Sequence, residues 1–154
     1  MQGEGIRKIL GILTSYFSIT MLPPIIVSLV YGDNTHNVFL ISMAIIIVSG
    51  LIVWLPVRTV QKELRFRDGF LVVVLIWVVL SMLAAIPLLL VENPSIRFID
   101  AIFESTSGLT TTGATILTGL DDMPHSILYY RQQLQWLGGM GIIVLAVAVM
   151  PALG

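Results

Sequence analysis

The run Ser107-Gly108-Leu109-Thr110-Thr111-Thr112-Gly113-Ala114-Thr115 is the most informative part of this chain. It is a polar run rich in Thr and Gly, and it separates two long apolar segments. The segment before it is helix-like but too short to cross a bilayer. Irregular backbone at membrane depth is tolerated only where it is buried in protein or lines a watery path. A loop that ends a half-length helix leaves carbonyls free to face a cation, as in an ion selectivity filter.

The composition around this stretch is that of a membrane protein. Of the 154 residues, 56% are hydrophobic and 11% are charged, whereas soluble domains carry roughly 25% charged residues; mean hydropathy is +0.97. Four uncharged runs are each long enough for a hydrocarbon core of about 30 Å, and they cover residues 9–31, 38–57, 70–91 and 132–154. The sequence therefore predicts an all-α membrane protein with four transmembrane helices and one re-entrant pore helix with a filter loop.

Charge and cysteine content exclude other classes. The net charge of −1 gives no electrostatic reason to expect a nucleic-acid partner, and the absence of cysteine excludes disulfides and thiolate metal sites. His36 and His125 are isolated, so we expect no metal beyond a transported alkali ion. The first apolar run, which follows Arg7 and Lys8, could instead be a signal peptide. It is longer than the usual apolar region of roughly 7–15 residues, and no small-x-small cleavage site follows it.

Basic residues predict the orientation in the membrane. With the N-terminus in the cytoplasm, six of the eight Lys and Arg residues lie on the cytoplasmic side, as the positive-inside rule requires. These six are Arg7, Lys8, Arg58, Lys62, Arg65 and Arg67. Only Arg97 and Arg131 lie toward the outside, together with the connector at residues 33–37 and the segment 92–122.

Prolines predict where the spans are disturbed. Pro23-Pro24 removes two backbone donors and should loosen the outer half of the first span. The second span should end near Pro56, and Pro87 should disturb the third near its outer end. Proline therefore marks a weak point in three of the four predicted spans.

The second half of the chain reads as span, short helix, loop and span. Ser95 is the expected N-cap of a short helix at residues 96–109, which would be roughly 20 Å long. Pro124 fits the start of the last helix. We expect two units: a two-helix membrane hairpin with its cytoplasmic connector at residues 1–69, and a membrane-pore-membrane repeat at residues 70–154.

The chemistry of the Thr/Gly run suits a potassium ion. The ion must exchange its water shell for a ring of oxygens, and backbone carbonyls are strong enough to hold it and weak enough to release it. Gly accepts positive φ without steric cost, Thr hydroxyls can add oxygens or fix the loop, and a helix C-terminus favours a cation. The predicted ion-binding residues are Thr110, Thr111, Thr112, Gly113 and, less centrally, Ala114.

These residues carry a family resemblance. Thr111-Thr112-Gly113 matches the Thr-x-Gly core of a potassium-channel filter, although that motif alone is weak. Together with Phe103-Glu104-Ser105, Gly113-Ala114-Thr115 and the run Leu134-Gln135-Trp136-Leu137-Gly138-Gly139-Met140-Gly141, the chain resembles the Trk/Ktr/HKT family of cation transporters, most closely the Trk-type potassium uptake subunit. The resemblance covers the whole chain.

The resemblance carries further implications. Family members have four such repeats in one chain, so this chain looks like an N-terminal fragment that supplies one quarter of a pore. Gly at position 113 goes with K⁺ in the plant branch, whereas Ser goes with Na⁺; Ala114-Thr115 replaces the Tyr-Gly of strict potassium channels. The family also implies a homodimer in the bacterial inner membrane and a cytosolic nucleotide-binding regulatory ring, with no cofactor bound by this chain itself.

Residues around the loop have plainer interpretations. We expect Glu104 to be a structural partner of Arg97 or Arg131, although it could attract cations, and we expect Arg131 to extend toward the membrane interface. Gly138, Gly139 and Gly141 could form a hinge, but small residues more often allow close helix packing in membranes.

Two other functions were weighed against cation conduction. Ser105-Thr106-Ser107-Gly108, with His125 as a base, faintly resembles a serine nucleophile site of an intramembrane protease. The leading residue of that site should be Gly rather than Ser, so we expect no enzyme. The alternative to conduction is a non-conducting structural or assembly subunit.

Overall fold

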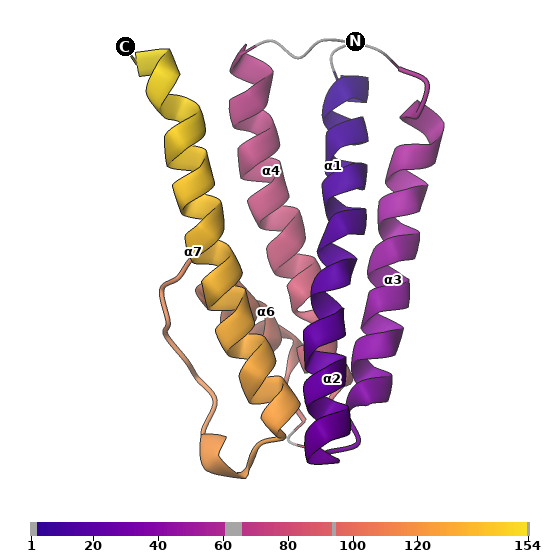
Figure 1. Ribbon diagram of the computed structural model, residues 1–154, viewed down its shortest axis with the longest axis vertical. Helices are drawn as coiled ribbons and strands as arrows, with labels where there is room; N and C mark the ends of the chain where they lie inside the picture. The colour runs from indigo at the N-terminus through magenta and orange to yellow at the C-terminus, as the bar shows by residue number, and fades with distance from the viewer. Residues whose placement is uncertain (1–2, 61–65, 94, 154) are drawn as a thin grey trace.

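The computed structural model describes residues 3–60, 66–93 and 95–153, without the side chains of residues 66, 67 and 145–153. Every regular element in these ranges is a helix, as predicted. The helices run side by side in one bundle, with both chain termini at one end and the α2–α3 turn at the other (Figure 1). Within the described residues, three stretches are long and apolar enough to cross a membrane: Gly3–Tyr31, His36–Val57 and Asp68–Leu90.

The first span is divided where proline was expected to disturb it. It consists of α1 (Gly3–Phe17), a 3₁₀ turn η1 (Ser18–Met21) and α2 (Leu22–Tyr31). Pro24 has no N–H to offer the Thr20 carbonyl four residues earlier, and Gln133 Nε2 from the last helix donates to that carbonyl at 2.9 Å instead. The predicted loosening is confirmed, and the freed carbonyl becomes a contact between distant segments.

The second span, α3 (His36–Trp54) with η2 (Leu55–Val57), packs directly on the first. Glycines make the close approach possible. A Cβ placed at Gly11 would lie 2.8 Å from Trp54 Cβ, and one at Gly50 would lie 2.9 Å from the backbone nitrogen of Ser15. These distances are shorter than real side chains show, so the two backbones meet only because both positions lack a side chain.

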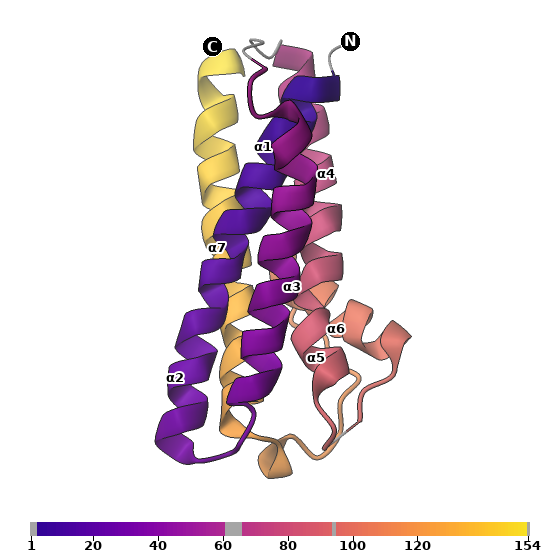
Figure 2. The ribbon, with the colours of Figure 1, turned by 90° about the vertical axis from the view of Figure 1, so that its right-hand side faces the viewer.

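The second half contains α4 (Phe66–Ala84), α5 (Ile86–Leu90), α6 (Phe98–Leu109), η3 (Leu120–Asp122) and α7 (His125–Leu153). α6 contacts both α4 and α7 and projects to one side of the bundle in the half away from the termini (Figure 2). α7 coincides with the fourth expected span. Its side chains beyond residue 144 lie outside the described part, so that span remains a prediction.

Pro87 divides the third span, as expected, and neighbouring helices bind the carbonyls that the break leaves free. Ala85 N donates to Met82 O at 3.3 Å rather than to Ser81 O. Ser105 Oγ of α6 donates to the Ser81 carbonyl at 2.8 Å, and Tyr130 OH of α7 donates to the Ala84 carbonyl, also at 2.8 Å. The break in α4 therefore fixes the position of both helices that flank the Thr/Gly loop.

A buried apolar core supports the bundle at the level of α6. Fully buried side chains from α3, α5 and α7 meet there, among them Phe39, Leu88, Ile127 and Tyr130. The rings of Phe39 and Tyr130 contact edge to face, with centroids 5.5 Å apart. This core gives α6 a rigid support on the side facing the bundle.

One predicted detail of α6 is wrong. The helix begins at Phe98, with Arg97 in extended conformation (φ −69°, ψ 154°) at the N-cap and no side-chain capping bond. Ser95 therefore does not cap it. Asp100 in the first turn, bonded to Arg97 Nε at 2.9 Å, instead places negative charge near the helix N-terminus.

Candidate functional site: the end of a half-length helix

α6 has the length and the surface expected of a re-entrant helix. Its 12 residues rise about 18 Å, little more than half of a hydrocarbon core. Its bundle-facing side buries polar groups, including Glu104, Ser105 and Ser107, while Phe98 and Ile99 lie exposed. A helix with a buried polar side and an exposed apolar side suits a position surrounded by protein rather than by water.

The Thr/Gly loop (residues 110–114) turns back over the end of α6. Thr111 and Gly113 both have positive φ, 57° and 71°, a region that Gly enters readily and Thr rarely. The N–H groups of residues 111, 112 and 113 donate back to the helix end: the first to Gly108 O at 2.9 Å, the others to Ser107 O at 3.0 and 3.4 Å.

These bonds determine where the loop carbonyls point. In a planar trans peptide, the N–H of one residue is opposite the carbonyl of the residue before it. The three N–H groups point back at the helix, so the carbonyls of Thr110, Thr111 and Thr112 point away from it. A row of oxygens directed the same way is what coordination of a dehydrated ion requires.

The five predicted ion-binding residues differ in how their carbonyls are occupied. Among the described residues, no hydrogen bond reaches the carbonyl oxygens of Thr111, Thr112 or Gly113. The Thr110 carbonyl accepts from Thr111 Oγ1 at 2.7 Å. The Ala114 carbonyl accepts from Ser107 Oγ at 2.7 Å and is thereby tied to α6.

The threonine hydroxyls brace the loop locally. Thr110 Oγ1 donates to Thr106 O at 2.8 Å and lies 2.8 Å from Thr112 Oγ1. Of the two predicted roles of these hydroxyls, the structure shows the second, which is to fix the loop. The side chains support the backbone and leave the coordinating role to the carbonyls.

A buried ion pair lies behind the loop. Glu104 Oε2 accepts from Arg131 Nε at 3.0 Å and from Nη2 at 2.8 Å, and the two residues are 4% and 8% exposed. The predicted pairing of Glu104 with Arg131 is confirmed, whereas Arg97 pairs with Asp100. The expectation that Arg131 extends to the membrane interface is wrong, because its partner lies inside the bundle.

The segment that follows Gly113 is attached to the same carboxylate. We call residues 114–117 the return limb. Glu104 Oε1 accepts from Thr115 Oγ1 at 2.6 Å and from Ile116 N at 2.8 Å. Sequence analysis predicted an ionic partner for Glu104 but not these two bonds, since nothing in the sequence indicates that the chain runs back along α6.

Gly138 brings α7 against the end of α6. A Cβ at this position would overlap the Leu109 carbonyl oxygen and lie 2.7 Å from the Leu109 carbonyl carbon. Gly139 is less confined, since its Cβ would lie 3.8 Å from Thr111 Cγ2. The predicted packing role is confirmed for Gly138, and it applies at the last residue of the pore helix.

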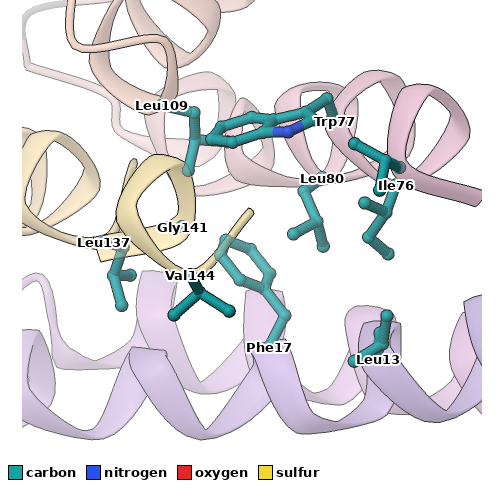
Figure 3. Close-up of a pocket in the computed structure, with 10 residues that line it drawn as sticks. Leu13, Phe17, Ile76, Trp77, Leu80, Leu109, Leu137, Gly141 and Val144 are labelled. Atoms are coloured by element: carbon teal, nitrogen blue, oxygen red, sulfur yellow. The ribbon is translucent and has the colours of Figure 1, made fainter. Parts of the chain in front are cut away.

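An apolar cavity of about 440 Å³ lies beside Leu109, the last residue of α6. It is bounded by α1, α4 and α7, and Figure 3 shows Trp77 and Leu109 at one side of it and Phe17 at another. Among the residues that the structure describes, no charged side chain lines it. These side chains offer a bare cation no oxygen ligand, whereas the Thr/Gly loop at the same helix end offers carbonyls.

The residues of the protease hypothesis are engaged elsewhere. Ser105 donates to Ser81 O and Ser107 donates to Ala114 O. The His125 ring stacks on Tyr31, with centroids 4.4 Å apart. Within the described residues, no hydrogen bond joins His125 to either serine, and no group of three or more His, Asp and Glu could hold a metal ion.

Asp33, which sequence analysis did not single out, attaches the α2–α3 turn to the start of α7. Its carboxylate accepts from Ser28 Oγ at 2.5 Å, Thr35 Oγ1 at 2.8 Å and Ser126 N at 2.9 Å. Burial opposes ionisation, but these hydrogen bonds outweigh it and hold the pKa of Asp33 below its usual value. Asp33 thus caps a helix more than ninety residues away.

The fold and the site define an integral membrane protein of the re-entrant pore-helix class. The TrkH family model, described as a cation transport protein, matches residues 35–154. The chain belongs to this family.

Individual relatives agree with this assignment. The chain is 53% identical over 149 residues to the Trk system potassium uptake protein TrkH of Halomonas elongata and 51% identical over 154 residues to that of Vibrio parahaemolyticus, covering 97% and 100% of this chain. It matches the crystal structure of the V. parahaemolyticus potassium transporter TrkH with a TM-score of 0.93 over 98% of its length. The chain spans about a third of these relatives: 31% and 32% of the two sequences and 32% of the crystallised chain.

Proposed function

We propose that this chain takes part in potassium uptake across a membrane by supplying one quarter of a pore lined by backbone carbonyls. The observation that carries the proposal is the row of carbonyls of Thr111, Thr112 and Gly113, which accept no hydrogen bond among the described residues and follow a half-length helix. The relatives are named potassium uptake proteins, which supports K⁺ as the cargo.

Conduction requires no chemical reaction on the protein. It requires oxygens that replace the water shell of the ion. A K⁺ ion that enters an inside-negative cell gains roughly 2.3 kcal/mol per 100 mV. The carbonyls replace its water shell, and the negative end of the α6 dipole favours a cation at the loop. The Ala114 carbonyl is bonded to Ser107 Oγ and the Thr110 carbonyl to Thr111 Oγ1, so we assign the central role to the carbonyls of Thr111, Thr112 and Gly113.

The arrangement in the cell is part of the same proposal. Residues 1–69 form a membrane hairpin and residues 70–154 form the first of four pore repeats. The excess of Lys and Arg places the N-terminus in the cytoplasm of a bacterial inner membrane. The remaining pore repeats, a second copy of the complete protein and a cytosolic nucleotide-binding ring are the proposed partners, as the family resemblance implies.

Substitution of Gly113 tests the filter. In a full-length protein that contains this segment, Gly113→Ser should reduce the preference for K⁺ over Na⁺ by roughly tenfold or more, because a contact to a charged group is worth roughly 1.5–3 kcal/mol and 1.4 kcal/mol is a factor of ten. Gly113→Asp should also reduce the rate. Uptake of Rb⁺ into proteoliposomes, with Na⁺ as competitor, measures both.

Gly119 provides the matched control for this experiment. Its φ is 68°, close to the 71° of Gly113, and a Cβ at either position meets no atom within 4 Å. Gly119→Ser therefore carries the same backbone strain outside the proposed filter and should keep wild-type selectivity. Equal selectivity in all variants would overturn the filter assignment. A wild-type protein that binds its partners but moves no K⁺ would favour the assembly-subunit alternative.

A further inference from the structure

We propose that Glu104 is a positioning residue for ion selectivity, which it controls by holding the return limb against α6. The proposal rests on the proposed function, because it concerns the shape of the same filter. The Glu104 carboxylate is occupied by donors from Thr115, Ile116 and Arg131, so the proposed role is indirect. Glu104 acts through Thr115 and Ile116, which follow the coordinating residues directly in the chain.

The first step is that the loop is fixed from two sides at Gly113. On the near side, Ser107 O accepts the N–H groups of Thr112 and Gly113. On the far side, Ser107 Oγ donates to Ala114 O, and Glu104 Oε1 accepts from Thr115 and Ile116. Glu104 and Ser107 are three residues apart and share one side of α6. The return limb is therefore attached at two successive points along that side.

The second step is that little else holds the return limb before Leu117, which is half-buried and packs against the core. Residues 110–116 are exposed, whereas Glu104 is 4% exposed. Packing contributes little where side chains face outward, so hydrogen bonds to a buried anchor determine where this backbone lies. Loss of the anchor frees the segment after Gly113 without removing any coordinating carbonyl.

The third step is that the site requires a carboxylate. Four donors converge on the two oxygens: Thr115 Oγ1 and Ile116 N on Oε1, and two guanidinium N–H groups of Arg131 on Oε2. A carboxylate offers only acceptors, whereas glutamine has an NH₂ in place of one oxygen. In Glu104→Gln the remaining oxygen should face Arg131, because hydrogen bonds to a charged guanidinium are the stronger ones. The NH₂ group then faces Thr115 and Ile116, and the bonds to the return limb are lost.

The consequence is specific to selectivity. Preference among alkali ions depends on the number and the placement of the carbonyl dipoles around the ion. A return limb that moves independently of α6 alters the placement of the Gly113 and Thr112 carbonyls for every ion. In variants that lack the Glu104 anchor, the K⁺ over Na⁺ preference should therefore fall by a larger factor than the yield of folded protein.

The experiment compares variants of a full-length protein containing this segment in proteoliposomes, with Rb⁺ uptake against Na⁺ competition as the readout. Glu104→Gln should reduce the K⁺ over Na⁺ preference by about tenfold, the loss expected for one hydrogen bond to a charged group. Glu104→Asp, which keeps the charge, should restore part of it. Thr115→Val removes one donor, leaves the ion pair with Arg131 intact and should give a several-fold loss.

Asp100→Asn is the matched control, because Asp100 lies one turn earlier on α6 and forms an exposed ion pair with Arg97. It should keep wild-type selectivity. If Glu104→Gln does not fold, Thr115→Val decides the question, since its side chain is exposed. Wild-type selectivity in folded Glu104→Gln or, failing that, in Thr115→Val overturns the proposal.

The two proposals fail in different ways. If Gly113→Ser changes selectivity and the Glu104 and Thr115 variants do not, only the positioning role is lost. If Gly113→Ser also behaves as wild type, the filter itself is wrongly assigned. Equal losses of uptake for K⁺ and Na⁺ in Glu104→Gln would indicate a role in folding alone and would also overturn the positioning role.

Discussion

The two halves of the chain are both helical hairpins, yet they are held together in different ways. In the first, α1 and α3 touch backbone to backbone through Gly11 and Gly50. In the second, α6 is inserted between α4 and α7 and contacts both, and beyond it the Trp77 side chain of α4 reaches Gly141 of α7. In the second half, therefore, the two spanning helices enclose the inserted helix and the Thr/Gly loop at its end.

The comparison shows that one residue type serves two purposes. Gly11 and Gly50 allow one spanning helix to approach another, which any membrane hairpin can use. Gly138 allows a spanning helix to approach the end of the inserted helix at Leu109, where the Thr/Gly loop begins. Substitutions that add one methyl group should therefore have different functional consequences in the two halves.

The largest effect is expected at Gly138. In Gly138→Ala the new methyl overlaps the Leu109 carbonyl, so the backbone of α6 or α7 must move. Overpacking of this kind costs about 1–3 kcal/mol. Here it displaces Leu109, the residue immediately before the loop. We expect a lower Tm in detergent and near-complete loss of Rb⁺ uptake.

Gly139→Ala is the control that separates overpacking against Leu109 from the change in helix propensity that any Gly→Ala substitution brings. Its methyl would lie 3.8 Å from Thr111 Cγ2, an ordinary contact, and Ala favours a helix by roughly 1 kcal/mol over Gly. The variant should be as stable as wild type or more so, with uptake retained. If both glycines respond alike, the contact with Leu109 is not what matters at position 138.

A smaller and purely structural effect is expected at Gly50. A methyl there would meet Ser15 and lie 3.0 Å from the Gly11 carbonyl oxygen, and overpacking should again cost about 1–3 kcal/mol. The first hairpin does not form the loop, so Gly50→Ala should reduce Tm while the K⁺ over Na⁺ preference stays unchanged. Gly69→Ala, whose methyl meets nothing within 4 Å, is the control. A changed selectivity in Gly50→Ala would show that the two halves are coupled.

Features that depend on local chemistry could be predicted from the sequence. The spans follow from apolar length, and the breaks near Pro23-Pro24 and Pro87 follow from the missing N–H groups. The existence of α6 follows from an apolar segment too short to cross. Its start was misplaced because Ser95 has the right side chain for an N-cap, whereas the backbone becomes helical only after Arg97.

Features that depend on tertiary placement could not be predicted. Two arginines were candidates for Glu104, and only the packing of α7 on α6 selects Arg131. The bonds from Thr115 and Ile116 to Glu104 require a loop that runs back along its own helix. Asp33 caps a helix that begins at His125, and capping signals are read from adjacent residues. In each of these three contacts, the joined segments are apolar or irregular in sequence. No local sequence pattern therefore indicates that they meet.

The smallest effect is expected at Asp33, which joins the two halves. Because its pKa is held below the ordinary value of 3.8 in the folded protein, its contribution to stability is complete above that value and is lost as the pH falls toward the lower folded pKa. Asp33→Asn should cost about 1 kcal/mol at neutral pH, roughly the difference between a hydrogen bond to a charged group and one to a neutral group.

Thermal unfolding in detergent over a range of pH measures this contribution. The difference in Tm between wild type and Asp33→Asn should be largest at neutral pH and shrink below pH 3.8, because the protonated carboxyl no longer serves as a full acceptor for Ser28, Thr35 and Ser126. Asp122→Asn, on the exposed η3 turn, should show no such difference. A Tm difference for Asp33→Asn that stayed constant with pH would mean that the side-chain shape, and not its charge, connects the first hairpin to α7.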